Sequence, residues 1–296
     1  MPYKPDLSSH QVNPLIELPK FSPIAEGIPG EDAIAAYERD GVVCLQGAFS
    51  KFWVDMVSKG MTKAQEKRGI ESGTDPLRSF RVHHPGEPGH FFIDTFMWQH
   101  MEEFHRFTHE GPAADLAMHM TRSTSIIFYF DFILIKEPGT SAKTPWHYDE
   151  AYWPITGNQM CNCWMVVEPA PKETTLRFVR GSHKWSKNYR LMSFNPYEDY
   201  PKPPDDPPVP DWDIESVTGD LVYAPLEPGD CVIFHNRVHH SAPGNSLNSM
   251  PRRALATHWI GDDIRYNDKL HTIDPPDRAD LRHGDRFECD LFPRVR

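Results

Sequence analysis

The chain reads Ser125-Ile126-Ile127-Phe128-Tyr129-Phe130-Asp131-Phe132-Ile133-Leu134-Ile135 over its most strand-like stretch, which stops at Pro138-Gly139. Residues of these types favour strands, and a proline–glycine pair marks a turn. Helices are expected mainly before this stretch, at Glu31–Arg39, Ser50–Lys67 and residues 100–122. Helices followed by many strands predict a mainly β fold, an antiparallel sandwich or barrel with flanking helices on one side. Further strand candidates lie at Gly41–Leu45, Cys161–Val167, Thr174–Val179, Asp220–Ala224, Asp230–Phe234 and Ala254–Ile260.

The composition indicates a globular protein and argues against two classes of partner. The chain has 296 residues, of which 39% are hydrophobic, and this is enough apolar material for a core. Its 29 prolines favour loops and strand edges over long helices. The net charge is −11 and no run of lysine and arginine occurs. Nucleic acid needs a basic surface, so neither nucleic acid nor an anionic membrane is an expected partner.

Domain organisation is simple. Residues 1–29 are rich in proline without a clear period, which is typical of an extended arm on the domain or on a neighbouring subunit. Such an arm would suit a homodimer. Residues 30–296 show no strong boundary and no internal repeat, so a single domain is expected. Within it, residues 195–219 are too rich in proline and aspartate for a core, and they predict a long, lid-like loop.

The N-terminal sequence and the cysteines favour a cytoplasmic protein. Residues 1–6 carry no apolar secretory segment, and no stretch approaches the roughly 18 apolar residues of a spanning helix. The cysteines are odd in number and scattered, so no disulfide framework is expected. Cys161 and Cys163 share one face of a strand candidate. We interpret them as small core residues, with a metal-binding pair as the alternative.

Chemistry-bearing residues occur in three separate segments. In Pro145-Trp146-His147-Tyr148-Asp149, an imidazole and a carboxylate point to one face of an extended chain and can bind one cation. Residues 228–245 form a turn and a strand that ends in several imidazoles. One of these would complete a facial triad of two histidines and a carboxylate, which leaves positions on Fe(II) open for a bidentate co-substrate and O₂. Arg252 opens the next strand, where a buried arginine could pair with a carboxylate of a keto acid.

In this order, the segments resemble the phytanoyl-CoA dioxygenase (PhyH)-like family of Fe(II)/2-oxoglutarate-dependent oxygenases. The resemblance covers roughly residues 30–262. It rests on Tyr37-Glu38-Arg39-Asp40-Gly41-Val42-Val43, Lys136-Glu137-Pro138-Gly139, His147-x-Asp149, Leu176-Arg177-Phe178-Val179-Arg180-Gly181-Ser182-His183-Lys184-Trp185, Gly229-Asp230 leading to His240, and Arg252.

The resemblance implies a double-stranded β-helix (a cupin-like jelly-roll) that binds Fe(II) through His147, Asp149 and His240. His240 is preferred over His239 and His235 because the family's distal histidine precedes a small-residue turn and then the arginine. The neighbouring His239 is expected to pack beside the ligand. His235 and also His258 are expected to be strand residues with satisfied hydrogen bonds.

The resemblance also implies how the co-substrate is held. Arg252 matches the residue that anchors the distal carboxylate of 2-oxoglutarate, and Trp164 matches a tryptophan near the co-substrate. Arg253 should face the other way, because successive residues of a strand alternate.

Several positions depart from the family pattern or refine it. Many relatives have His-Gly-Ser after the distal ligand, and the serine helps to hold the co-substrate, but this chain has His240-Ser241-Ala242. A glutamine common on the strand before the first ligands is also absent, with Asp131 and Phe132 nearby. The co-substrate pocket is therefore expected to be built differently. Asp149 argues against the halogenating branch, where glycine or alanine opens a site for halide.

The activity implied is hydroxylation or another oxidation of a small-molecule substrate. 2-Oxoglutarate and O₂ are consumed, and succinate and CO₂ are released. The first candidates for substrate contact are Tyr148, Tyr152 and Trp153, which follow the ligands. Aromatic walls would suit an apolar or ring-bearing substrate. Further candidates are Phe91, Phe92, Trp98 and the lid-like loop.

Two alternatives stay open at this point. A non-catalytic jelly-roll protein could bind a small molecule with its ligands idle, and a zinc hydrolase could use the same three ligands. The complete triad argues against the first, and a hydrolase would have no need for Arg252. A CoA-thioester substrate is poorly supported by so acidic a chain.

Overall fold

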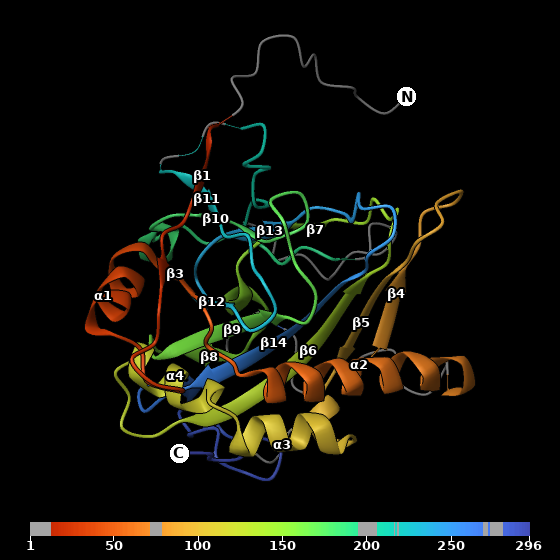
Figure 1. The fold of residues 1–296 in the computed structure, drawn as a ribbon. Helices are drawn as coiled ribbons and strands as arrows, with labels where there is room; N and C mark the ends of the chain where they lie inside the picture. Colours follow the sequence, from red (N-terminus) through yellow and green to blue (C-terminus); the bar gives the residue numbers. More distant parts are fainter. Residues whose placement is uncertain are drawn as a thin grey trace.

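Two β-sheets face each other, and helices cover the outer side of the larger sheet (Figure 1). The computed structural model describes residues 13–71, 79–194, 206–215, 217, 219–268, 272 and 281–296, without the side chains of 67–71, 79 and 80. Residues 1–12 of the expected arm, and 195–205, 216 and 218 of the expected lid, lie outside the described residues.

The larger sheet has eight strands and includes the stretch that the sequence singled out, which becomes β6. β-Branched and aromatic side chains pack well on a pleated, buried surface, and nearly all of β6 is buried. In spatial order the strands are β2 (Lys20–Phe21), β3 (Val42–Leu45), β12 (Cys231–His235), β9 (Met160–Val166), β14 (Arg252–Ile260), β6 (Ile127–Lys136), β5 (Phe91–Thr95) and β4 (Ser79–Val82).

The smaller sheet has five short strands and lies over the inner face of the larger one. Pairing within the described sheets is antiparallel, except that β1 runs parallel to β11 and β2 parallel to β3. Two facing antiparallel sheets of this kind form the predicted double-stranded β-helix, or jelly-roll. The strands of the smaller sheet are β1 (Leu15–Glu17), β11 (Leu221–Tyr223), β10 (Arg177–Val179), β13 (His240–Ala242) and β7 (Thr144–His147), and a separate pair joins β8 (Ile155–Thr156) to β15 (Arg265–Tyr266).

Helices surround the outer face of the larger sheet. The prediction of a single helix over residues 100–122 is wrong. Gly111 adopts an extended conformation before Pro112, and this divides the segment into two helices. A proline disfavours the helical conformation of the residue before it. Among the described residues, no helix combines the length and apolar character that crossing a bilayer requires. The helices are α1 (Glu31–Asp40), α2 (Lys51–Glu71), α3 (Glu102–Glu110) and α4 (Ala113–Met120), with 3₁₀ turns η1 (Met97–Gln99), η2 (Asp149–Tyr152) and η3 (Ser182–Lys184).

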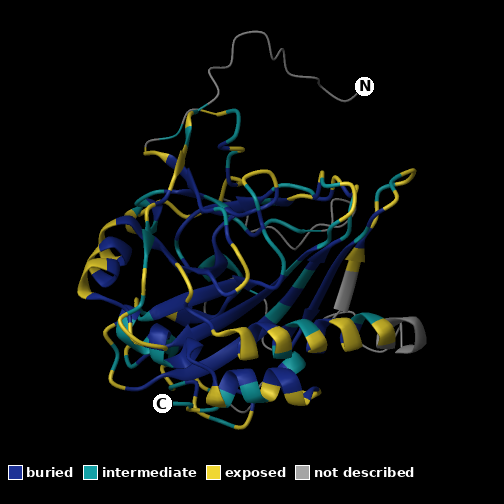
Figure 2. Cartoon of the chain, viewed as in Figure 1, coloured by how far each residue is buried: buried dark blue, intermediate teal, exposed yellow. Residues whose placement is uncertain are grey.

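The larger sheet separates two hydrophobic cores. On its outer face, Ile133 and Ile135 pack with the helices, whose inward sides are buried and whose outward sides are exposed (Figure 2). On its inner face, Val166 and Ala254 pack with residues of the smaller sheet. All five cysteines are free, and Cys161 and Cys163 belong to the helix-side core, as predicted.

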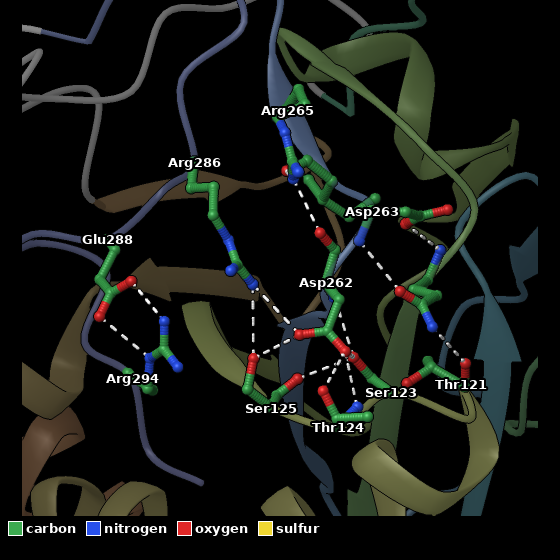
Figure 3. A network of polar contacts seen from close by, with 12 residues as sticks. Thr121, Ser123, Thr124, Ser125, Asp262, Asp263, Arg265, Arg286, Glu288 and Arg294 are labelled. Carbon is green, nitrogen blue, oxygen red and sulfur yellow. Dashed lines mark hydrogen bonds and ion pairs between the residues drawn. The ribbon is translucent and has the colours of Figure 1, made fainter.

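Asp262, just after β14, joins the end of that strand to the residues before β6 and to the C-terminal segment (Figure 3). Its carboxylate accepts hydrogen bonds from the hydroxyls of Ser123, Thr124 and Ser125, from the amide of Thr124, and from Arg286. Burial alone would raise the pKa of Asp262, but these donors hold it well below its usual range. Their loss should therefore destabilise the fold.

Replacing Asp262 with alanine is expected to lower the melting temperature by several degrees. Asp262 is partly exposed, so water replaces part of what is lost, and a net loss of about 2 kcal/mol is expected, the worth of one hydrogen bond to a charged group. In a large domain, 1 kcal/mol corresponds to roughly 2–4 °C. Because the folded-state pKa is depressed, this stabilisation is present above the unfolded pKa of about 4 and is lost on acidification below it. Glu288→Ala, which removes an exposed pair with Arg294, is the control and should change little. The measurement is thermal unfolding of the wild type and both variants. A melting temperature of Asp262→Ala equal to that of Glu288→Ala would contradict the prediction.

Candidate metal centre

Strand pairing brings two imidazoles together. β7 and β13 are antiparallel neighbours, and His147 is the direct cross-strand partner of His240. Direct partners project from the same face of a sheet about 5 Å apart. The two rings accordingly lie with their centroids 4.1 Å apart, and both are buried. The sequence separates these residues widely, so the adjacency is a product of the fold.

Asp149 completes the cluster from the turn η2 that follows β7. Its Oδ1 lies 3.5 Å from Nε2 of His147 and 3.6 Å from Nε2 of His240. These separations exceed a good hydrogen bond and suit atoms arranged around one ion. Among the residues that the structure describes, this is the only group of three or more histidine, cysteine, aspartate or glutamate side chains whose ligand atoms all lie within 4.8 Å of one another.

Hydrogen bonds fix the orientation of both imidazole rings. Nδ1 of His147 lies 2.7 Å from the carbonyl oxygen of Pro145, and Nδ1 of His240 lies 3.0 Å from that of Val238. A carbonyl only accepts, so each Nδ1 carries the proton and each Nε2 keeps a free lone pair. Metal-binding histidines are typically held in this way, with the other ring nitrogen donating to a carbonyl or carboxylate.

The protonation states of the cluster also suit a cation. Burial would raise the pKa of Asp149, but His240 and His147 hold it well below its usual range. Burial, together with the neighbouring His147, lowers the pKa of His240 to about 3. At neutral pH, Asp149 is therefore a carboxylate and His240 a neutral imidazole, the forms in which these side chains bind metals.

The same interior contains two buried cations. Arg252 is 2% exposed, and its Nε and Nη1 have no hydrogen-bond partner among the described residues. Burial lowers the pKa of Arg252 to about 9. Its guanidinium lies 5.5 Å from the ring centroid of Trp164, so the structure brings these two predicted residues together. The prediction that Arg253 faces the other way is confirmed, because it pairs with Glu168 on the helix side.

The second cation, Lys136, was missed as a site residue in the sequence. It is fully buried at the end of β6, directly opposite Arg252 on β14. Its Nζ donates to the carbonyl oxygens of Ala242 and Pro243. Burial lowers the pKa of Lys136 well below its usual value, and Arg252 adds to the effect. The sequence signal that could have revealed it is a lysine placed directly after the apolar run Phe132-Ile133-Leu134-Ile135.

Asn162 and His258 also face the triad, and neither was predicted as a site residue. Nδ2 of Asn162 lies 3.4 Å from Oδ2 of Asp149 and 3.4 Å from Nε2 of His258. His258 is buried, which lowers its pKa to about 4, and its Nδ1 has no partner in the described structure. The expectation of full hydrogen bonding was thus wrong for His258. It was correct for His235, which is bonded at both ring nitrogens.

The aromatic residues after the ligands are divided between the two faces of the smaller sheet. Tyr152 lies near the triad, with its ring edge-on to His147 at 5.8 Å. Trp153 is buried against His258, in a separate cluster that it forms with Phe130 and Phe287. Tyr148, in contrast, lies on the outer face, where its ring stacks on His239 at 5.3 Å. His239 therefore packs beside the site, as expected, and Tyr148 is not brought to the triad.

Two upstream aromatic candidates lie away from the interior. Phe92 and Trp98 belong to the helix-side core, so their prediction as substrate walls is wrong. The physical reason is strand alternation: Phe91 faces inward beside Lys136, which turns Phe92 outward. Asp131 also faces the helices and accepts from the amides of Met97 and Trp98. Burial raises the pKa of Asp131 to about 7.

The serine after the distal histidine faces away from the interior. Ala242 belongs to the inner core, whereas Ser241 is the cross-strand partner of Arg177 and lies on the opposite face of the strand from His240. Thr144, Ser241 and Ala242 all line a hollow that extends over Trp146 and Arg177. The Ser241 hydroxyl therefore cannot replace the serine that relatives carry at the next position. The backbone of Ala242 is held instead by Lys136.

A buried group of two histidines and a carboxylate, set between the sheets of a double-stranded β-helix, defines the class of non-haem iron oxygenases. The chain belongs to the phytanoyl-CoA dioxygenase (PhyH) family, which it matches over residues 37–254. It is accordingly a non-haem iron, 2-oxoglutarate-dependent oxygenase that uses Fe(II), 2-oxoglutarate and O₂.

Similar proteins agree with this fold. The multifunctional dioxygenase ausE of Aspergillus calidoustus is 24% identical over 263 residues, which cover 83% of this chain and 78% of ausE. The carbocyclase SnoK from nogalamycin biosynthesis superposes with a TM-score of 0.68 at 21% identity, covering 93% of this chain and 99% of SnoK. EctD from S. alaskensis superposes with a TM-score of 0.65 at 14% identity, covering 94% of this chain and 93% of EctD.

Binding of a divalent ion to the triad is expected to stabilise the folded chain. At a concentration about 100 times the dissociation constant, a ligand adds about 2.7 kcal/mol, which corresponds to several degrees. Co(II) added to the metal-free protein should raise the melting temperature of the wild type and leave Asp149→Ala unchanged. His119→Ala, on the remote helix α4, is the control and should respond like the wild type. A similar shift in Asp149→Ala would place the ion elsewhere.

Proposed function

We propose that this protein uses Fe(II), 2-oxoglutarate and O₂ to hydroxylate or otherwise oxidise a small, apolar, ring-bearing molecule, with release of succinate and CO₂. The observation that carries the proposal is Arg252, a buried cation on the same interior as the triad, whose Nε and Nη1 have no hydrogen-bond partner among the residues that the structure describes. An uncompensated buried charge costs several kcal/mol, and a carboxylate ligand would compensate it. A zinc hydrolase has no use for this residue.

Each member of the proposed site has a definite task. His147, Asp149 and His240 would hold the iron from one side and leave its other positions open. The bound iron and co-substrate supply the oxidising chemistry. The carbonyl-bound imidazoles keep their lone pairs directed at the ion, and the enclosing sheets exclude water.

The proposed anchor of the co-substrate contains both buried cations. Arg252 and Lys136 are cross-strand partners, so one carboxylate can lie between them. Such an anion favours the charged form of Lys136, whose pKa is lowered without it. The lysine also holds the backbone at Ala242, where relatives carry the serine. Trp164 flanks the guanidinium and would form a wall of this pocket.

The character of the substrate is inferred from the inner face of β6. Phe132 and Leu134 point inward and stay half-buried, whereas Ile133 and Ile135 on the outer face are fully buried. Opposite them, Ala254 and Ala256 are small, and this face of the interior carries apolar and aromatic side chains. Such walls suit an apolar, ring-bearing molecule.

A candidate entrance adjoins the triad. Phe194 lines the hollow beside β7, which has a volume of about 530 Å³, and its ring also lies edge-on to His147 at 4.8 Å. One aromatic ring thus separates this hollow from the metal centre. Tyr152 holds the neighbouring segment in place, because its hydroxyl bonds to both the amide and the carbonyl of Met192.

Two of the similar proteins support ring-bearing substrates. SnoK is described as a carbocyclase, and the related epimerase SnoN has been crystallised with Fe³⁺, α-ketoglutarate and nogalamycin RO. SnoN superposes with a TM-score of 0.65 at 22% identity, so the likeness is one of fold. A homodimer and a cytoplasmic location stay predictions.

Removal of the Arg252 guanidinium is expected to weaken 2-oxoglutarate binding at least about 30-fold, since a buried charge partner is worth 2–5 kcal/mol. Anaerobic titration of the Fe(II) protein with 2-oxoglutarate, followed by the visible charge-transfer band, measures the affinity. Arg253→Ala is the matched control: the same residue type one position on, facing the helices. Absence of the band in iron-loaded wild type would sink the oxygenase proposal.

Ring-bearing molecules are expected to stimulate succinate release above the level without substrate. A panel of polycyclic aromatic and terpenoid compounds should be compared with linear acyl-CoA thioesters at equal concentrations, because the apolar walls favour the former. His147→Ala serves as the blank for non-enzymatic decarboxylation. Stimulation by the thioesters alone would overturn the inferred substrate class.

A further inference from the structure

The position of Asp149 is not fixed by the sheet. β7 ends at His147, and Asp149 opens the turn η2, beyond the last residue paired with β13. His147 and His240, in contrast, are held by direct pairing. The Asn162 amide reaches the Asp149 carboxylate at 3.4 Å, which is a long contact. The distance between Asp149 and the two imidazoles therefore depends on what holds η2.

Glu150, the next residue, ties η2 to the turn between β12 and β13. Its amide donates to the carbonyl oxygen of Asn236 at 3.1 Å. Its Oε1 accepts from Nη1 of Arg237 at 2.6 Å. The two side chains are only 18% and 24% exposed, so solvent screens this pair less than a surface pair.

Arg237 in turn belongs to the segment that orients His240. Its amide donates to Nδ1 of His235, and the next amide, of Val238, donates to the carbonyl oxygen of His235. The carbonyl of Val238 is the acceptor that holds Nδ1 of His240. The guanidinium also donates to the carbonyl oxygen of Trp185, which fixes it from a third segment. The arginine thus connects Asp149's turn to the group that sets the ring of His240.

We propose that Glu150 and Arg237 are positioning residues that hold Asp149 at its working distance from His240 and so set the affinity for the metal ion. The inference rests on the proposed iron site but concerns residues outside the ligand set. Partners that orient metal ligands typically change metal affinity 10–100-fold when removed. The pair would act by holding the position of Asp149, and this effect on metal affinity can be distinguished from the direct effect of the two charges on the ion.

The signs of two substitutions distinguish geometry from charge. A purely electrostatic effect would make Arg237→Ala bind Fe(II) more tightly, because a nearby positive charge is lost, and would make Glu150→Gln bind more weakly. Positioning predicts that both bind about 10–100-fold more weakly. It also predicts that the double variant binds Fe(II) no more weakly than the weaker-binding of the two single variants, because both substitutions remove the same interaction. Arg237→Lys should recover part of the loss.

The experiment is an anaerobic competition of the full chain with a chelator for Fe(II), accompanied by the visible spectrum of the Co(II) protein. The band intensities of Co(II) report ligand geometry, and the melting temperature of the metal-free protein reports general stability. Glu150→Gln keeps the side-chain volume and so guards against misfolding. Glu168→Gln is the matched control: it removes a comparably buried arginine pair on the far side of the larger sheet, and should leave Fe(II) affinity and the Co(II) spectrum unchanged.

Weaker Fe(II) binding in both Glu150→Gln and Arg237→Ala, with altered Co(II) spectra, supports the proposal. Wild-type affinity in Arg237→Ala, tighter binding in that variant, or an equal loss in Glu168→Gln overturns it and leaves the oxygenase function standing. No Fe(II) binding by the wild type overturns both together.

Discussion

The direct pairing of His147 with His240 across β7 and β13 is the constraint on which the site depends. A slip of one residue would exchange the two faces of a strand. The outer face opposes such a slip, because Tyr148 stacks there on His239, and the indole of Trp212 donates to His239 Nδ1 at 3.1 Å. The aromatic cluster outside the sheet thus helps to keep the imidazoles inside.

The larger sheet adds the rest of the interior through one strand. Arg252, Ala254, Ala256 and His258 alternate along β14 and share its inner face. The ends of this row are polar and its middle is small and apolar. That distribution separates the proposed anchor of the co-substrate from the metal end. The same strand turns Arg253 outward to the helices, so adjacent arginines serve different layers of the fold.

What the sequence revealed was mostly local. The strand types, the His147-x-Asp149 pair and the alternation at Arg252 are readable because period-two patterns need no knowledge of partners. The same alternation would have placed Tyr148 outside, opposite to His147, and the Gly111-Pro112 pair signals the helix break.

Residues that meet only through pairing could not be predicted in this way. Asn162 and His258 come from different strands, β9 and β14, and face Asp149 only through their register. Lys136 reads as a solvent-exposed strand end until the structure places it opposite Arg252. The choice of His240 among neighbouring histidines came from family resemblance, which carries information about pairing that a single chain does not display.

The parallel pairing of β1 with β11 has a consequence for folding during biosynthesis. β1 leaves the ribosome early, yet its partner β11 is among the later strands to be made, since Leu15 pairs with Leu221. Contacts between such distant residues form late in folding. Until then, β11 presents an open edge, which is a template for pairing with another chain. Pairing of β1 with β11 is thus a late step of folding that covers this edge, and a chain in which it has not yet formed is exposed to aggregation.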